Sequence, residues 1–168
     1  MLEPLFLLLF PAAMALAAGC DLFTMTIPNR LTIGFAILFV PVAAVAGLPI
    51  AEIGFHLLAG AAMLAVAIAF FAFGWIGGGD AKFFAATALW LGWSDLLTYA
   101  FWFSLLGGAL TLALIYARGV PLPASLGRMD WLARLHDSRQ GIPYGIALAA
   151  AGLIIYPETI WMAVFAGQ

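Results

Sequence analysis

The chain has 168 residues, of which 66% are hydrophobic and only 8% are charged, with a formal net charge of −2. A soluble domain this apolar would have too little polar surface to face water, so the composition predicts a single integral membrane domain over residues 1–168. The small negative charge gives no basis for nucleic-acid binding, and the single cysteine, Cys20, excludes an intrachain disulfide. The expected fold class is all-α and polytopic, with the lipid bilayer as a partner.

Six apolar segments follow one another along the chain, and a spanning helix needs about 20 apolar residues. The fourth is too short to cross alone, so we expect it to begin below the membrane surface, after non-helical backbone at Gly77–Asp80 that is buried in protein. Pro157 and Glu158 interrupt the last segment. Six helices is the preferred count and five the alternative. The expected helices are Pro4–Cys20, Leu31–Leu48, Ile53–Ile76, Ala81–Trp93, Leu96–Ala117 and Ile142–Phe165.

The basic residues predict the orientation. Under six helices, Arg30, Lys82 and the four arginines within 118–140 share one side, and cytoplasmic loops carry an excess of Lys and Arg. That side is therefore expected to face the cytoplasm of an inner membrane, with both termini outside and with Asp21 and Asp80 on the cytoplasmic side. The acidic residues expected at or near the other side are Glu3, Glu52, Asp95 and Glu158.

The stretch 118–140 is the one long polar segment and is expected to form a cytoplasmic loop. Within it, Trp131–Leu135 has two interpretations of equal weight. It forms either a short amphipathic helix on the membrane surface or part of a solvated connector whose arginines only set the topology.

Asp21 and Asp80 stand at the edges of apolar segments, where a carboxylate is costly. Insertion scales put the cost at about 2.5–3.5 kcal/mol at a helix centre and lower near the interface, so such groups are functional candidates by default. Two carboxylates that share one proton can hydrolyse a peptide: the ionised one takes a proton from water, and the protonated one polarises the scissile carbonyl. Taken singly, Asp80 is better explained as a helix N-cap and Asp21 as an interfacial loop residue, and it is their coincidence on one side that favours a catalytic pair.

The residues around Asp80 suggest how it would work. Three successive glycines, Gly77–Gly79, each cost about 1 kcal/mol in a helix relative to Ala, so they predict an extended, mobile segment beside an incoming peptide. Asp21 follows a helix C-terminus and Asp80 precedes an N-terminus. These ends, worth about 0.3–1 kcal/mol each, favour the shared proton on Asp21 and Asp80 as general base, with Lys82 reinforcing that bias if it turns towards the site.

The local sequences resemble those of one family. Gly77-Gly78-Gly79-Asp80-Ala81-Lys82 is similar to the Gly-x-Gly-Asp signature of type IV prepilin peptidases, which are membrane aspartyl proteases. Asp21 with Ile27-Pro28-Asn29-Arg30-Leu31 resembles the segment of the family's first aspartate. Ile142-Pro143-Tyr144-Gly145-Ile146-Ala147 resembles the motif that opens its final helix. The three matches occur in family order and span most of the chain.

The resemblance implies a function and roles for residues. Asp21 and Asp80 would be the catalytic pair, Gly77 and Gly79 the motif glycines, and Pro143 and Tyr144 structural or substrate-positioning residues. The family removes short basic leaders from pilin-like precursors at the cytoplasmic membrane face, so such a precursor is the expected protein partner.

One departure from the larger, bifunctional members is informative. Those members add a cytoplasmic methyltransferase domain with paired Cys-x-x-Cys motifs between the first helices. Here Asp21 and Arg30 are separated by only a short segment, and Cys20 stands alone. We therefore expect no methylation by this segment, and a likeness to the short peptidases of Flp/Tad-type pilus systems and, more distantly, to archaeal preflagellin peptidases.

Two alternatives remain beside a prepilin peptidase. A non-enzymatic transporter or assembly subunit would use Asp21 and Asp80 for proton or ion handling, although such acids usually lie at midplane depth. A presenilin-like intramembrane protease would share Gly-x-Gly-Asp but have another pattern around its first aspartate. No cofactor is expected, and no metal site, because His56 and His136 lack ligand spacing. The sequence leaves the substrate pilin and the oligomeric state open.

Overall fold

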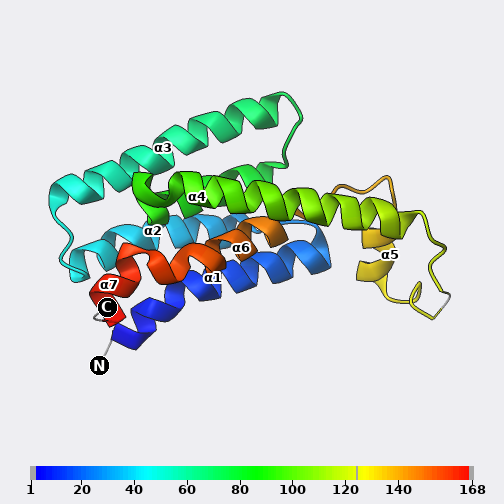
Figure 1. Cartoon of the computed structure of the whole chain (residues 1–168), viewed down its shortest axis with the longest axis horizontal. Coiled ribbons are helices and arrows are strands. Elements are labelled where there is room, and N and C mark those ends of the chain that lie inside the picture. Colours follow the sequence, from blue (N-terminus) through cyan, green and yellow to red (C-terminus); the bar gives the residue numbers. More distant parts are fainter. Residues whose placement is uncertain (1–2, 124, 167–168) are drawn as a thin grey trace.

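The computed structural model describes residues 3–123 and 125–166, apart from the side chains of Glu3, Pro4 and Ala166, so the expected placement of the Glu3 side chain lies outside the described residues. The regular structure of the described residues is helical throughout, which confirms the predicted fold class. Figure 1 shows the arrangement. The elements are α1 (Glu3–Thr24), α2 (Asn29–Val45), α3 (Ile50–Ala72), α4 (Gly78–Arg118), α5 (Asp130–His136), α6 (Tyr144–Ile155), the 3₁₀ turn η1 (Tyr156–Glu158) and α7 (Ile160–Ala166).

The helices run back and forth along the long axis of the molecule (Figure 1). At one end, here called the loop end, α1 finishes, α4 and α6 begin, and α5 lies nearby. At the opposite end, here called the termini end, α1 begins and α7 finishes. Three helices, α1, α3 and α4, are long and apolar enough to cross a membrane, and α2 and α6 with η1 are shorter apolar helices. This architecture is that of a polytopic membrane protein.

Helix α4 contains a sharp reversal at Gly92, where φ is 68° and ψ is −171°. Across it, the ring of Phe84 lies 5.7 Å from that of Tyr99 and 6.0 Å from that of Phe103. In a straight helix, residues that far apart in sequence would be separated by about 23–29 Å. Helix α4 is therefore a hairpin of two arms, residues 78–91 and 93–118. This confirms two helical segments where Ala81–Trp93 and Leu96–Ala117 were predicted.

The last predicted helix, Ile142–Phe165, is broken as its sequence indicated. Helix α6 ends at Ile155, η1 contains Pro157 and Glu158, and α7 resumes at Ile160. Proline lacks a backbone N–H and clashes with the preceding turn, so the helix cannot continue through it. The short α7 then packs back against α1.

Aromatic rings form the core at the termini end. Trp90 and Trp161 are each 1% exposed, and their ring centroids lie 5.0 Å apart. Their indole N–H groups donate to backbone carbonyls, Trp90 to Phe35 at 2.9 Å and Trp161 to Trp90 at 2.7 Å, so neither buried donor is left unpaired. Phe35 also stacks flat on Trp90 with the centroids 4.9 Å apart.

His56 of α3 completes this core at the α4 reversal. Its Nδ1 donates to the carbonyl of Leu89 at 2.9 Å, which satisfies a backbone group next to the break. A Cβ atom at Gly92 would stand 2.8 Å from the His56 ring, so the glycine supplies both the positive φ and the space for the imidazole.

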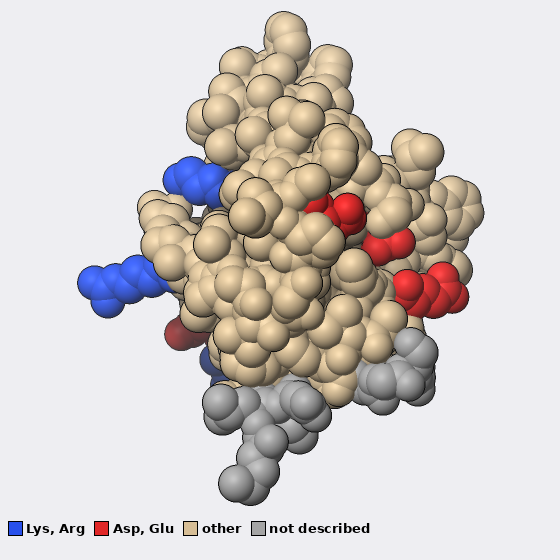
Figure 2. Space-filling view, turned by 90° about the vertical axis from the view of Figure 1, so that its left-hand side faces the viewer, with Lys and Arg blue, Asp and Glu red and all other residues tan. Residues whose placement is uncertain are grey.

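Charge is segregated between the two ends. Figure 2 looks at the termini end and shows acidic side chains gathered on it. His56 Nε2 lies 3.9 Å from the Glu52 carboxylate, and Asp95 is close enough to His56 and Glu158 for electrostatic interaction with both. Arg30 and Lys82 lie near the starts of α2 and α4, at the loop end. This separation agrees with the predicted sides, while the orientation in a membrane stays a prediction.

Candidate active site

Asp21 lies in the last turn of α1 and is only 4% exposed. The helix ends three residues later, where the backbone N–H of Met25 donates to the Asp21 carbonyl at 2.8 Å and Met25 itself adopts a positive φ of 56°. A non-glycine residue in that conformation is uncommon and marks a tight turn. The turn directs the following segment, Thr26–Asn29, back across the loop end.

The Asp21 carboxylate caps the N-terminus of α6. Its Oδ2 accepts the backbone N–H of Gly145 at 2.7 Å, one of the donors that a helix start leaves without a partner. A Cβ atom at Gly145 would stand 2.8 Å from Asp21 Oδ2 and 2.8 Å from Ile27 Cδ1, so any larger residue would displace one of these side chains. Pro143 is the N-cap of α6 and is completely buried.

Asp80 lies in the first turn of α4 and is half-buried. The expectation of an extended, non-helical Gly77–Asp80 segment is wrong: Gly77 alone is extended, with φ −70° and ψ 149°, and α4 begins at Gly78. Gly77 is the N-cap, so the interpretation of Asp80 as the N-cap is also wrong. The Asp80 carboxyl reaches back to the Gly77 N–H, as the third helical residue does in a capping box. This side-chain contact helps to offset the poor helix propensity of the glycines.

Ile27 joins the two carboxylate-bearing regions. A Cβ atom at Gly79 would lie 3.4 Å from the Ile27 nitrogen, and the Ile27 side chain itself reaches Gly145. The start of α4 therefore packs against the backbone of Ile27 and the start of α6 against its side chain. Asp80 is near enough to Asp21 for their charges to interact. Sequence reasoning used Ile27 only as part of a motif and missed both it and Gly145 as packing partners of the aspartates.

The hydrogen bond from Gly145 bears on which aspartate holds the shared proton. From the sequence, each aspartate lies at one helix end, and the C-terminus of α1 favours the protonated acid at Asp21. The structure adds a second helix end at Asp21, the N-terminus of α6, whose partial positive charge acts in the opposite sense. The two ends oppose each other at Asp21, so only the N-terminus of α4 at Asp80 still favours the proton on Asp21, and that assignment stays a prediction.

Lys82 and Tyr144 have different surroundings. Lys82 Nζ donates to Asn29 Oδ1 at 3.0 Å, which links the start of α4 to the start of α2. The Tyr144 hydroxyl pairs with Thr111 Oγ1 at 3.1 Å, while its ring packs against Gly107. Tyr144 lines a cavity together with Asp80, whereas Lys82 lines a separate groove between α2 and α3.

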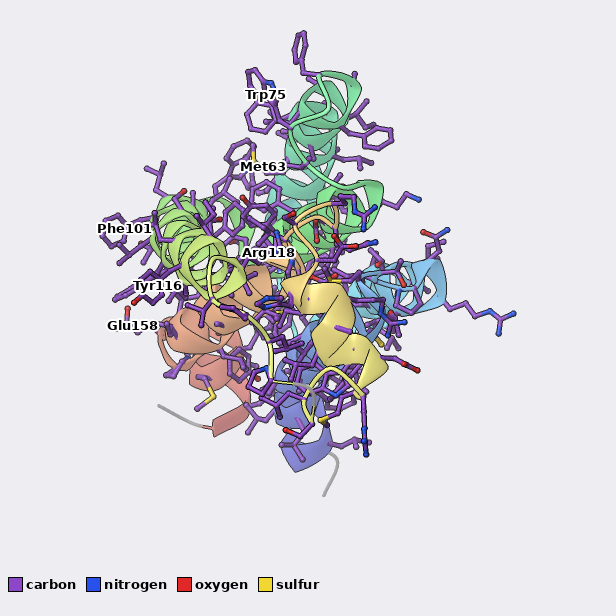
Figure 3. All side chains as sticks on the ribbon, turned by 90° about the vertical axis from the view of Figure 1, so that its right-hand side faces the viewer. Met63, Trp75, Phe101, Tyr116, Arg118 and Glu158 are labelled. Carbon is purple, nitrogen blue, oxygen red and sulfur yellow. The ribbon has the colours of Figure 1, made fainter. Side chains whose placement is uncertain are left out.

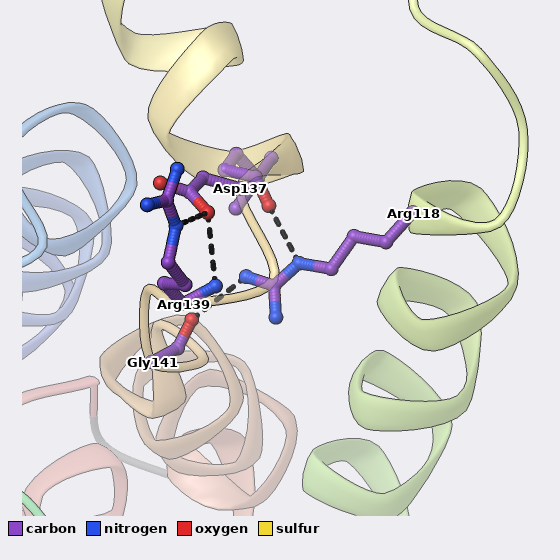
Figure 4. A network of polar contacts seen from close by, with 5 residues as sticks. Arg118, Asp137, Arg139 and Gly141 are labelled. Carbon is purple, nitrogen blue, oxygen red and sulfur yellow. Dashed lines mark hydrogen bonds and ion pairs between the residues drawn. The ribbon is translucent and has the colours of Figure 1, made fainter.

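The polar loop packs across the loop end. Arg134 of α5 donates to the Phe23 carbonyl at 2.6 Å, and the Trp131 ring meets the Phe23 ring at 5.5 Å. Figure 3 looks onto this end, with Arg118 beside α5 and Trp75 at the outer tip beyond α3. Arg118 donates to the carbonyls of Leu135 and Gly141, each at 2.9 Å (Figure 4). Of the two interpretations of Trp131–Leu135, the structure has the short helix, α5, and its position at a membrane surface stays a prediction.

Asp137 closes this loop after α5. The backbone N–H of Arg139 donates to its Oδ1 at 2.9 Å, and the Arg139 guanidinium lies 3.3 Å from the same oxygen (Figure 4). The backbone hydrogen bond, followed by the Arg139 side chain and the charge of Arg118, holds the pKa of Asp137 below its usual value. Among residues 3–123 and 125–166, no three His, Cys, Asp or Glu side chains are grouped to hold a metal ion.

Comparisons with known proteins identify the family. A family model described as the type IV leader peptidase family matches residues 8–112, which include both aspartates and the glycine motif. A prepilin leader peptidase/N-methyltransferase of Bacillus subtilis (strain 168) is 34% identical over 157 residues, covering 88% of this chain and 55% of the relative. The chain thus spans about half the length of that curated relative. No solved structure matches it. As the resemblance of its three motifs predicted, the chain belongs to the type IV leader peptidase family.

Proposed function

We propose that the protein is a membrane-embedded aspartyl peptidase that removes the leader from pilin-like precursors at the cytoplasmic face of the inner membrane. Asp21 and Asp80 are its catalytic pair. The observation that carries the proposal is the meeting of these two carboxyls at one end of the bundle, one buried and one half-buried, from helices far apart in the sequence. Family membership and the relative's name support the same activity.

The geometry suits a shared proton. Two carboxyls close together in a poorly hydrated site hold one proton between them because two negative charges would repel. The ionised member activates water and the protonated member polarises the scissile carbonyl, without a covalent intermediate. Backbone donors hold both side chains, Gly145 for Asp21 and Gly77 for Asp80, and such fixed partners limit the rearrangement needed during the reaction.

The surrounding elements fit the proposed substrate. A precursor with an apolar segment would lie beside the helices, and its polar leader would reach the loop end, where α5 packs against α1. Anionic lipid would hold a basic leader there, at about 1 kcal/mol for each Lys or Arg near the surface. This end would face the cytoplasm and both termini would lie outside.

The test is cleavage of a pilin-like precursor by the purified protein in liposomes, followed by N-terminal sequencing of the product. Asp21→Asn and Asp80→Asn should each abolish cleavage, because neither amide exchanges the proton. Asp95→Asn is the matched control, since Asp95 is a partly buried aspartate at the termini end, and it should keep activity.

Two outcomes would contradict the proposal. Full processing by either dyad variant would remove that aspartate from the mechanism. Proton flux through wild-type liposomes that is lost in both dyad variants, without cleavage of any precursor, would favour the transporter alternative.

A further inference from the structure

A small cavity opens beside Asp80 and has no role in the mechanism above. It lies between α3, the two arms of α4 and α6, and has a volume of about 60 Å³. A single water needs only about 10–15 Å³, so the cavity has room for more than the water that the two aspartates would share. Its lining residues are Val66, Ala67, Phe70, Ile76, Asp80, Phe84, Phe103, Tyr144 and Leu148.

The walls of the cavity are apolar except at its Asp80 end. Phe84 and Phe103 contribute rings whose centroids are 6.0 Å apart. The Tyr144 hydroxyl pairs with Thr111, so it is the Tyr144 ring that faces the space. A charged or amide side chain would lose its hydration here with few polar partners in exchange, which is costly. The cavity is therefore suited to an apolar side chain.

The cavity extends inward from Asp80 along the bundle. Phe84 lies one turn further into α4 than Asp80, Leu148 one turn further into α6 than Tyr144, and Val66 nearly two turns before the end of α3. These three lining residues show that the cavity runs from Asp80 away from the loop end. In a precursor with a polar leader and an apolar segment, the leader would lie at the loop end. The residue on the apolar side of the scissile bond is then the one that reaches the cavity.

We propose that this cavity is a specificity pocket for the substrate side chain that directly follows the scissile bond, and that it selects an apolar side chain by size. The inference rests on the proposed function, because it places the scissile bond at Asp80. Val66 and Phe70 of α3 set the width of the pocket. Both are partly exposed, at 40% and 42%, so their side chains can change without overfilling the core.

The first experiment narrows the pocket. The probes are pilin-like precursors that differ only in the residue after the scissile bond, which is Ala, Leu, Phe or Asp, and cleavage is measured in liposomes. Val66→Phe should lower kcat/KM for the Phe probe relative to the Ala probe by about tenfold, since apolar pockets discriminate by size on that scale. Ile68→Phe is the matched control: Ile68 is 55% exposed on the same helix and does not line the cavity, so its variant should leave the ratio unchanged.

The second experiment widens the pocket. Phe70→Ala should raise kcat/KM for the Phe probe relative to the Ala probe, and Phe73→Ala should leave this ratio unchanged. These two are matched because each ring lies 5.3 Å from Trp75, yet only Phe70 lines the cavity. Thermal unfolding in detergent shows that each variant is folded.

Each result is decisive. The pocket is supported if kcat/KM for the Phe probe relative to the Ala probe falls in Val66→Phe and rises in Phe70→Ala. The Asp probe should have the lowest kcat/KM in every variant. Variants that change kcat/KM by the same factor for all probes overturn the pocket while leaving the dyad intact. Failure of the wild-type protein to cleave any probe contradicts the proposed function itself and this inference with it.

Discussion

The two ends of the bundle are packed by different means. At the termini end, large rings such as Trp90, Trp161 and Phe35 stack on one another, and their polar atoms donate to nearby carbonyls. At the loop end, glycines let backbone approach side chains, and Gly145 stands where any Cβ would strike Asp21. The first arrangement buries area and stabilises the fold, and the second leaves room for carboxyls and a cavity. The aromatic core that stabilises the fold and the proposed catalytic site thus lie at opposite ends.

The largest expected effect is on stability at the termini end. Trp90→Ala should lower the free energy of unfolding by about 3–5 kcal/mol, because it removes a buried ring and leaves a cavity. Cleavage per folded molecule should be unchanged. Thermal unfolding in detergent, combined with activity normalised to folded protein, measures both. Trp93→Ala is the control, since Trp93 is 46% exposed and its removal should lower the free energy of unfolding only slightly. A specific loss of activity in Trp90→Ala would break the division between the ends.

Gly145→Ala should produce the converse result at the loop end. The new methyl group would displace Asp21 or Ile27, and a shift of about 1 Å in a catalytic group can cost roughly a hundredfold in rate. Unfolding should change by only about 1–3 kcal/mol, as for other overpacked sites. Gly19→Ala is the control, because a Cβ there meets nothing within 4 Å and lies two residues from Asp21. Equal activity of the two variants would contradict the assigned role of Gly145.

Lys82→Met tests whether the proposed active site extends as far as Lys82. Lys82 is bonded to Asn29 and lines the groove between α2 and α3, so its loss should remove one exposed hydrogen bond, worth about 0.5–1.5 kcal/mol. We expect less than about a threefold change in kcat/KM. Asn29→Ala removes the same bond from its other side and should match it. A much larger loss in Lys82→Met alone would place the ammonium in the chemistry.

The smallest effect is expected from Asp137. The pKa of Asp137 is lowered by Arg139 and Arg118, so the loop contact is present above the unfolded value, about 3.9, and is lost only as pH falls through the lower folded value. A dyad should give a bell-shaped pH–rate profile with macroscopic pKa values that belong to the pair. Asp137→Asn should therefore leave the acid limb of that profile unchanged down to about pH 5. A moved acid limb would show that the loop controls the site.

Sequence reasoning predicted the features that depend on composition and local pattern. Apolar length indicated the helical segments, and Pro157 indicated the break in the last one. The cost of a carboxylate singled out Asp21 and Asp80, which lie near each other, while their catalytic role stays a prediction. Sequence reasoning failed where tertiary packing decides. Helix propensity predicted extended backbone at Gly77–Asp80, yet Ile27 and the Asp80 side chain support a helix from Gly78 onwards. Likewise, no local signal indicates that Gly145 donates to Asp21, because that contact joins the two ends of the chain.

The reversal at Gly92 bears on how the protein is assembled in the membrane. The first arm of α4, residues 78–91, is about 21 Å long, shorter than a hydrocarbon core of about 30 Å. Such an arm cannot insert as an independent spanning helix, so both arms must enter as one hairpin. Its bend also needs His56 to satisfy the Leu89 carbonyl. Helix α3 must therefore be in place when the hairpin settles, and α6 must dock afterwards for Gly145 to reach Asp21.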